Sequence, residues 1–229
     1  MIQTMSTQPD YSVWRTIDYK PAISNFLPVR LLPFLEKENC LLDVGCNTGN
    51  VALYFAEHGY LCNGIDINPA AITEAKARGS CHPQGSRANF EVANWLSFDH
   101  SGKFHAILMT RFLTCVPGFD DWHSCLTKAF ALLRPNGLLY VHDFVLDPYS
   151  PIYAPRYALG KANGWREGNF PVHDSEGSFL FIAHHHSETD ILEMIAPYNT
   201  LVLDKHDSVS MNGNPCCMLE YIGRKLAPP

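Results

Sequence analysis

Hydrophobic positions follow two different spacings in the first half of the chain. Residues 40–44 form a short apolar run, and Val51, Ala52, Phe55 and Ala56 then recur at helical spacing. The first pattern indicates a buried strand, and the second indicates a helix with one buried face. The same succession repeats downstream. We expect further strands at residues 60–67, 89–93, 104–110 and 138–145, and further helices at residues 69–78 and 119–133.

Alternating strands and helices predict a parallel sheet with right-handed crossovers. The pattern changes near the C-terminus, where residues 201–209 and 215–224 read as two strands. Asn212 and Gly213 lie between them, and Asn-Gly is a strong hairpin signal. We therefore expect five parallel strands followed by an antiparallel hairpin.

Two segments depart from this rhythm. We interpret residues 1–37 as an N-terminal arm with helical pieces that cover the site, interrupted by Pro28 and Pro33. Residues 147–183 are rich in Pro, Gly and aromatic residues, and long insertions of this kind often act as lids. We interpret them as an acceptor-binding insertion, with a strand-turn-strand near residues 174–181. Residues 38–229 would then form a single domain.

A glycine-containing turn follows the first strand. Gly45 can adopt backbone angles closed to other residues, and Gly49 allows a ligand or the following helix to approach. Asp66 lies at the end of the second predicted strand, where its two oxygens can accept hydrogen bonds from both hydroxyls of a ribose. This pairing predicts a nucleoside-containing ligand across the first two strand ends.

Three motifs carry a family resemblance. LDVGCNTG at residues 42–49 and GIDIN at residues 64–68 resemble the first two motifs of the class I S-adenosylmethionine (SAM) dependent methyltransferases, and LLRPNG at residues 132–137 resembles the family's turn before the fifth strand. The family's loop is usually GxGxG. Asn47 replaces its middle glycine, and asparagine tolerates left-handed angles better than most residues.

The resemblance implies a class I methyltransferase fold, which is a three-layer α/β sandwich around a seven-stranded, mostly parallel sheet with a C-terminal antiparallel hairpin. It also implies that SAM is the cofactor and S-adenosylhomocysteine (SAH) the product. Trp95 fits either the adenine site or the structural core. The residues implied to contact SAM are Asp43, Gly45, Cys46, Asn47, Gly49, Asp66, Ile67, Asn94, Trp95 and Thr110.

The acceptor side is less well defined. The aromatic residues of the N-terminal arm either pack on the domain or form a lid. Arg111 either binds an acidic acceptor or pairs with a local carboxylate. The candidate acceptor-binding residues are Tyr11, Trp14, Tyr19, Arg111, Tyr149, Tyr153 and Trp165.

A hydroxyl or protonated amine acceptor requires a base within hydrogen-bonding distance. The candidates are His142, Asp143, His185 and His186, and we expect one of His185 and His186 to face the acceptor. The run from His184 to His186 also suggests a metal, but consecutive positions on a strand point in opposite directions. We therefore predict no metal.

The charge and amino-acid composition of the chain argue against some classes of binding partner. The formal net charge is −6, and no Lys/Arg cluster is present, which argues against nucleic acid. No apolar stretch is long enough to span a bilayer, and residues 1–10 lack a signal-peptide pattern, so we expect a cytoplasmic protein without a membrane partner. The eight cysteines lack CxxC spacing, which favours free thiols. A monomer or homodimer is expected.

The sequence therefore predicts a SAM-dependent methyltransferase that modifies a small-molecule acceptor at an O, N, S or C nucleophile. A nicotinamide-dependent oxidoreductase is disfavoured because GxGxxG spacing is missing and no second catalytic domain follows. A SAM-binding protein without turnover stays open, since a fold alone does not specify activity.

Overall fold

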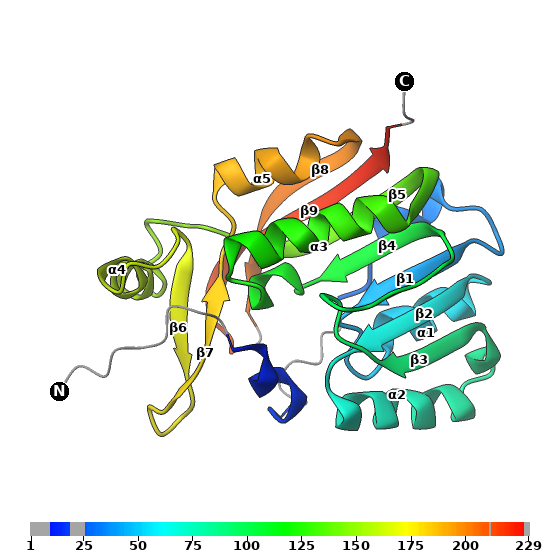
Figure 1. Cartoon of the computed structure of the whole chain (residues 1–229), viewed down its shortest axis with the longest axis horizontal. Helices are drawn as coiled ribbons and strands as arrows, with labels where there is room; N and C mark the ends of the chain where they lie inside the picture. Colours follow the sequence, from blue (N-terminus) through cyan, green and yellow to red (C-terminus); the bar gives the residue numbers. More distant parts are fainter. Residues whose placement is uncertain (1–9, 19–25, 211, 227–229) are drawn as a thin grey trace.

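A seven-stranded sheet runs through the middle of the protein (Figure 1). This computed structural model describes residues 10–18, 26–210 and 212–226. The strands lie in the order β3-β2-β1-β4-β5-β9-β8. They are β1 (Cys40–Val44), β2 (Leu61–Asp66), β3 (Ala88–Val92), β4 (Phe104–Thr110), β5 (Leu133–Val145), β8 (Tyr198–Val209) and β9 (Pro215–Lys225).

The direction of the strands confirms the predicted fold class. Neighbouring strands from β3 to β5 are parallel, whereas β9 is antiparallel to both β5 and β8. Strands joined by crossover helices must run parallel, while the short connection between β8 and β9 allows an antiparallel pair. The sheet is thus the predicted mostly parallel sheet with a C-terminal antiparallel hairpin.

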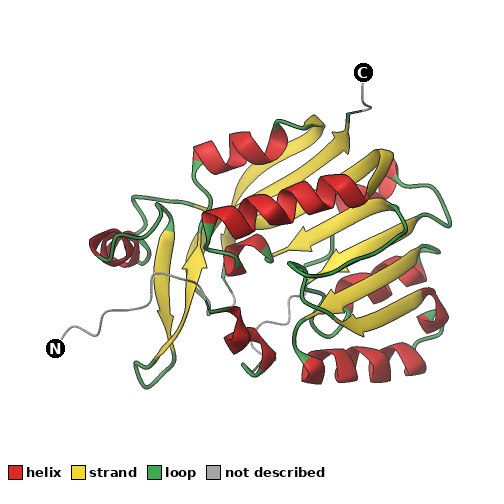
Figure 2. Ribbon diagram, viewed as in Figure 1, coloured by secondary structure: helices red, strands yellow, loops and turns green. Residues whose placement is uncertain are grey.

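Helices cover both faces of the sheet (Figure 2). Buried side chains of α3 (Phe119–Leu132) and α5 (Glu188–Ile195) form one core with the strands, centred on Trp122. On the other face, α1 (Asn50–Glu57), α2 (Pro69–Cys81) and the 3-10 helix η3 (Val29–Phe34) pack around Phe55. The predicted three layers are therefore present. Within the described ranges, the other 3-10 helices are η1 (Tyr11–Arg15), η4 (Gly85–Arg87) and η5 (Leu113–Cys115).

Residues 147–183 contain more regular structure than expected. The predicted strand-turn-strand is present as a two-stranded antiparallel sheet of β6 (Asn169–His173) and β7 (Phe179–His184). An unpredicted helix, α4 (Ala154–Ala162), packs beside β6. Figure 1 shows this unit at one side of the main sheet. A small separate core fills the junction, made of Phe144, Tyr153, Phe170, Ala183, Cys216 and Met218.

No helix in the described ranges is both long and apolar enough to cross a lipid bilayer. The N-terminal helix η1 lies between the main sheet and the β6–β7 hairpin (Figure 1). Its Trp14 contacts Phe181 of β7, with ring centroids 4.3 Å apart. The chain's first described segment is therefore positioned beside the C-terminal ends of the parallel strands.

Candidate functional site

A cavity lies at the carboxyl ends of β1, β2 and β4. The parallel register aligns these ends, because Val44 of β1 pairs with Ile65 of β2 and Met109 of β4. Ligands of open α/β sheets bind at this edge. Of the residues implied to contact SAM, those lining the cavity are Asp43, Gly45, Cys46, Asn47, Asp66, Ile67, Asn94, Trp95 and Thr110.

The Asp66 carboxylate is fixed by backbone hydrogen bonds. Its Oδ2 accepts from the Asn47 N–H at 2.9 Å, and its Oδ1 accepts from the Asn68 N–H at 2.8 Å. Burial raises the pKa of this carboxyl, and the backbone N–H groups oppose that rise. Each carboxylate oxygen can accept more than one hydrogen bond. The group is therefore held in place while keeping acceptor capacity toward the cavity.

Asp43 is a buried carboxyl with incomplete hydrogen bonding. Its side chain lines the cavity, and its Oδ2 has no hydrogen-bond partner among the described residues. Burial, with the charge of Asp66 nearby, raises the pKa of Asp43 to about 7. A buried ionised carboxylate is unfavourable until a cation or donor pairs with it. This end of the cavity thus favours a positively charged group.

The turn after β1 borders the cavity, but its backbone N–H groups are largely hydrogen-bonded within the protein. The N–H groups of Gly45 and Cys46 both donate to the Ile65 carbonyl, at 2.8 and 2.9 Å. Asn47 has φ 48°, which confirms that asparagine adopts the left-handed conformation there. Several amides that could have met an anion are therefore already paired within the protein.

Of the two roles expected for Gly49, the structure favours the approach of the following helix. Gly49 does not line the cavity, although its φ of 79° does require glycine. A Cβ at this position would lie 2.6 Å from Phe90 Cε1 of β3. The glycine therefore allows the start of α1 to pack on an aromatic ring, rather than allowing a ligand to approach.

Asn94 and Trp95 follow β3 and line the cavity. The Asn94 Oδ1 accepts a hydrogen bond from the Leu96 N–H at 3.0 Å, which stabilises the turn. Trp95 is also part of the core beneath α3 and is 3% exposed. Its ring is thus part of the core and also borders the cavity, and contact with adenine stays a prediction.

Four of the predicted acceptor residues line the cavity: Tyr11, Trp14, Arg111 and Tyr153. Tyr149 does not, because its side chain is 92% exposed. Trp165 is also absent from the cavity wall and packs near Gly160 of α4. Tyr19 lies outside the described residues.

Sequence reasoning did not select several residues of the opposite wall. A signal for them was present, since side chains two apart on a strand share a face. Thus Phe170 and Val172 of β6 both face the cavity, as do Phe181 and Ala183 of β7. The cavity-lining residues that sequence reasoning missed, on these two strands and on other elements, include Phe144, Arg156, Phe170, Val172, Phe181, Ala183, Ser210 and Asn212.

The same alternation separates the three consecutive histidines. His185 continues the Phe181 and Ala183 face and lines the cavity. Its ring stacks on Phe144, with centroids 4.9 Å apart and an interplanar angle of 10°, and its Nδ1 is 2.7 Å from the Tyr157 hydroxyl. Burial and neighbouring positive charge hold the pKa of His185 well below its usual value. The imidazole is therefore neutral at neutral pH.

His142 and Asp143 project to opposite faces of β5, and neither lines the cavity. The His142 ring stacks on Phe26 at 3.6 Å, and burial lowers its pKa to about 4. The Asp143 oxygens accept hydrogen bonds from the N–H groups of Thr114 and Phe144, at 3.1 and 2.8 Å. The expectation that these two residues reach an acceptor is therefore corrected, because neither side chain borders the cavity.

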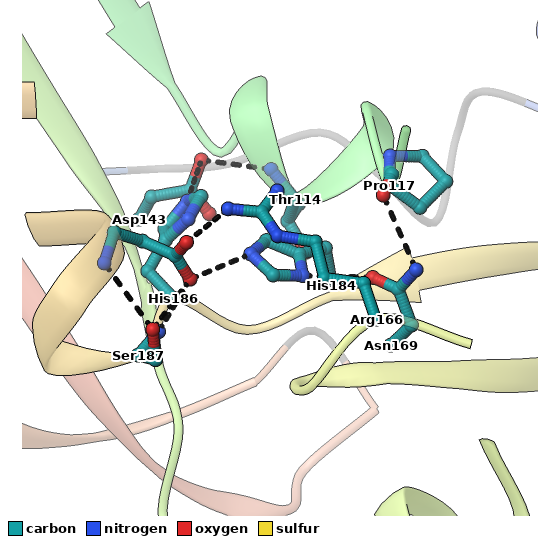
Figure 3. Close-up of polar contacts among 9 residues, drawn as sticks. Thr114, Pro117, Asp143, Arg166, Asn169, His184, His186 and Ser187 are labelled. Carbon is teal, nitrogen blue, oxygen red and sulfur yellow. Dashed lines mark hydrogen bonds and ion pairs between the residues drawn. The ribbon is translucent and has the colours of Figure 1, made fainter. Parts of the chain in front are cut away.

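A buried polar network lies on the other side of the histidine run (Figure 3). The His184 Nδ1 is 2.8 Å from Asn169 Oδ1, and the Asn169 amide donates to the Pro117 carbonyl at 3.2 Å. The His184 Nε2 is 3.2 Å from Asp190 Oδ2, and Asp190 also pairs with Arg166. The network joins β6, β7 and α5 to the loop before α3.

This network revises the argument made against a metal. His184, His186 and Asp190 bring potential ligand atoms within 4.8 Å of one another, because residues two apart do share a face. However, both His184 nitrogens already face protein oxygens, and Asp190 also accepts hydrogen bonds from Ser187. The absence of a metal remains a prediction.

Comparison with known proteins assigns the family. A family model described as a methyltransferase domain matches residues 16–188. An O-methyltransferase from Aspergillus sclerotiorum is 29% identical over 48% of this chain and 42% of its own length. The ubiquinone biosynthesis O-methyltransferase of Histophilus somni is 31% identical over 54% of each chain. The chain spans about half the length of the curated relatives that it matches.

A solved structure matches over a larger share of the chain. A SAM-dependent methyltransferase from Methanosarcina mazei is 28% identical and has a TM-score of 0.81. The match covers 88% of this chain and 98% of that protein. The strand order, the acidic residues at the strand ends and the family match agree with one another. The chain belongs to the methyltransferase domain family.

Proposed function

We propose that this protein transfers a methyl group from SAM to a small-molecule acceptor. The observation that carries the proposal is the position of Asp43 and Asp66, which line one cavity from adjacent strand ends. One carboxyl is buried and lacks a partner on Oδ2 within the described chain, and the other is held rigidly. These properties suit a cofactor that carries both a positive charge and a ribose.

The residues present fit SAM in two places. The unmet Oδ2 of Asp43 is suited to the cofactor's ammonium group, because pairing with a cation favours the ionised carboxylate. The Asp66 carboxylate has the acceptor capacity for two ribose hydroxyls. When bound, SAM supplies an electrophilic sulfonium methyl group, so the protein mainly has to bind and orient the acceptor.

His185 is the strongest candidate for the base. It lines the cavity, and its pKa is lowered enough to keep the ring neutral. In the tautomer that carries its proton on Nδ1, that nitrogen donates to the Tyr157 oxygen and Nε2 is left as an acceptor. A proton released by a hydroxyl or amine acceptor would then pass to Nε2.

The antiparallel β9 beside β5 supports this function over nicotinamide-dependent oxidation, because the parallel dinucleotide-binding sheet lacks that strand. The net charge of −6 supports a small-molecule acceptor over nucleic acid. A protein that binds SAM without transferring its methyl group would have the same cavity, so only a measurement of activity separates it from a methyltransferase.

Two measurements test the proposal. Isothermal titration calorimetry should show SAH binding to the purified protein and no binding of NAD or NADP. Incubation with SAM labelled in the methyl group and a pooled metabolite extract should then yield a labelled small molecule. Failure of the protein to bind SAH would refute the proposal, and SAH binding without any labelled product would favour the inactive alternative.

A further inference from the structure

Two arginines line the same cavity as Asp43 and Asp66. Arg111 follows β4, and its guanidinium lies 5.8 Å from the centre of the Phe144 ring. Arg156 comes from α4, and its guanidinium lies 5.4 Å from the centre of the Tyr153 ring. Neither forms an ion pair with a carboxylate in the described parts of the chain. The cavity is therefore lined both by two carboxyl groups and by two guanidinium groups that have no ion-pair partner in the described chain.

Arg111 is held in an unfavourable backbone conformation. Its φ is 53°, which side-chain-bearing residues seldom adopt, and its N–H donates to the His142 carbonyl at 2.7 Å. Outliers of this kind cluster at functional sites, where the surrounding structure holds them. The conformation maintains a large cationic side chain at the end of a central strand.

The Arg111 guanidinium also has unused donors. Its Nε is buried without a hydrogen-bond partner among the described residues. The nearby acid is Asp143, but no ion pair joins its carboxylate to the Arg111 guanidinium among the described residues, and its oxygens accept from the N–H groups of Thr114 and Phe144. A buried donor without a partner is unfavourable, and a carboxylate is the group that best satisfies a guanidinium.

Aromatic rings connect the two arginines. The His185 ring stacks on Phe144 at 4.9 Å and lies against Tyr153, with centroids 4.7 Å apart. Phe144, His185 and Tyr153 thus form a continuous aromatic wall from Arg111 to Arg156. A flat ring would pack on this wall, since aromatic groups favour stacked or edge-to-face contacts.

We propose that the acceptor is a flat aromatic acid whose carboxylate pairs with Arg111 while its ring lies against Phe144, His185 and Tyr153. Arg156 adds positive charge at the same wall. This inference rests on the proposed function, because it assigns the acceptor of the same site. The acceptor's negative charge would also offset the positive sulfonium beside it.

Matched pairs of acids and amides test the proposal. The probes are benzoate, 4-hydroxybenzoate and indole-3-acetate, each compared with its uncharged amide by calorimetry on SAH-saturated protein. At least one acid should bind about tenfold or more tightly than its amide, since pairing with a guanidinium is charge-assisted. Arg111→Gln should remove that preference by weakening acid binding more than amide binding, and Arg156→Gln should reduce it by roughly threefold.

Two control variants separate the effect of the Arg111 charge from a general loss of positive charge and from unfolding. Arg134 is exposed and donates only to the Lys103 carbonyl, so Arg134→Gln should change neither affinity. Arg111→Lys keeps the charge but loses the planar fork, so it should show an intermediate preference and a melting temperature close to that of the unaltered protein.

Three outcomes would overturn the inference. The first is that the unaltered protein binds no acid more tightly than its amide. The second is that Arg111→Gln keeps the same preference for the acid. The third is that Arg111→Gln binds SAH more weakly while it keeps the preference for the acid. The last would assign Arg111 to the cofactor. If the unaltered protein fails to bind SAH, the proposed function fails instead, which distinguishes the two.

Discussion

The Asp66 carboxylate and the Asn47 backbone N–H are joined by a hydrogen bond of 2.9 Å. This contact ties the end of β2 to the turn after β1, and a second hydrogen bond, from the Asn68 N–H, ties it to the start of α2. The acid that would bind a ribose also sets the shape of the turn that would lie under the rest of the cofactor. Cofactor binding and loop geometry therefore depend on one side chain.

Asp66→Ala should weaken SAH binding by roughly 10- to 100-fold, because hydrogen bonds to a charged group contribute about 1.5–3 kcal/mol each. Calorimetry on the folded variant measures this effect. Glu91→Ala removes an exposed carboxylate from the neighbouring strand β3 and should leave the affinity unchanged. Equal SAH affinity in Asp66→Ala and the unaltered protein would contradict the assignment of the site.

Asp43 should make the apoprotein less stable as the pH rises. Its pKa is about 7 in the folded protein against 3.8 for the ordinary side chain. Between these values the folded state keeps a proton that the unfolded chain releases, so the free energy of unfolding falls as pH rises from about 4 to about 7. The fall is up to about 4 kcal/mol, since each pH unit between the two pKa values corresponds to about 1.4 kcal/mol.

Asp43→Asn removes this titration. Urea unfolding at pH 4.5, 6 and 8 should show that the variant loses less stability over this range than the unaltered protein, and that it is more stable at pH 8. The same variant should bind SAH more weakly. Parallel stability curves for the two proteins would show that Asp43 ionises normally in the fold.

A comparison of Gly49 with Gly177 separates the cost of backbone strain at positive φ from the cost of steric overlap with a neighbouring side chain. Both have positive φ, 79° and 84°, but a Cβ on Gly49 would meet the Phe90 ring at 2.6 Å, whereas a Cβ on Gly177 would meet nothing within 4 Å. Gly177→Ala should therefore destabilise the protein by about 1–2 kcal/mol from backbone strain alone. Gly49→Ala should be worse by a further ~1–3 kcal/mol from overpacking.

Thermal and urea unfolding of both glycine variants test this comparison. Phe90→Leu combined with Gly49→Ala should recover part of the difference, because the smaller side chain makes room for the new methyl group. Equal destabilisation by the two single substitutions would mean that crowding against Phe90 has little effect.

Asp190 takes part in two sets of interactions at the start of α5. It completes a capping box with Ser187, and it pairs with Arg166 and His184 in the buried network. Ser187→Ala should cost about 1 kcal/mol of unfolding free energy, as for other N-caps. Asp190→Ala should cost about 3 kcal/mol or more, because it also removes the ion-pair partner of the partly buried Arg166 and the hydrogen-bond partner of the buried His184.

Urea unfolding measures both values, and Glu188→Ala is the matched control in the same helical turn. Glu188 is 86% exposed and pairs only with Lys205, so its loss should cost less than about 1 kcal/mol. If Asp190→Ala were no worse than Ser187→Ala, the network would contribute nothing beyond the cap.

Sequence patterning located the parallel strands well, most closely for β4, which is a nearly continuous apolar run. Residues 104–110 were predicted with the observed bounds of β4. The helix predicted at 69–78 continues to Cys81, because Gly79 does not adopt a positive φ and packs near the Phe90 ring instead of ending the helix. The α4 helix was missed, since its apolar residues face a small local core.

The cofactor side was easier to predict than the acceptor side. Asp43 and Asp66 are set by the ends of strands, which a linear pattern reveals. The positions of His142 and His185 depend on which face of a strand meets another element, and no pattern within the strand itself records that. Arg156 reaches the cavity only through the packing of α4 on β6, a contact between separate segments.

The unit of α4, β6 and β7 has its own hydrogen-bonded sheet and its own buried side chains, and it supplies much of the wall opposite the parallel strands. Under the proposed function, Tyr153 and Arg156 of this unit would face the acceptor, while Asp43 and Asp66 of the parallel strands would face the cofactor. Exchanging residues 147–183 for another insertion would then reshape only part of the acceptor wall, because Arg111, Phe144 and His185 lie outside that segment.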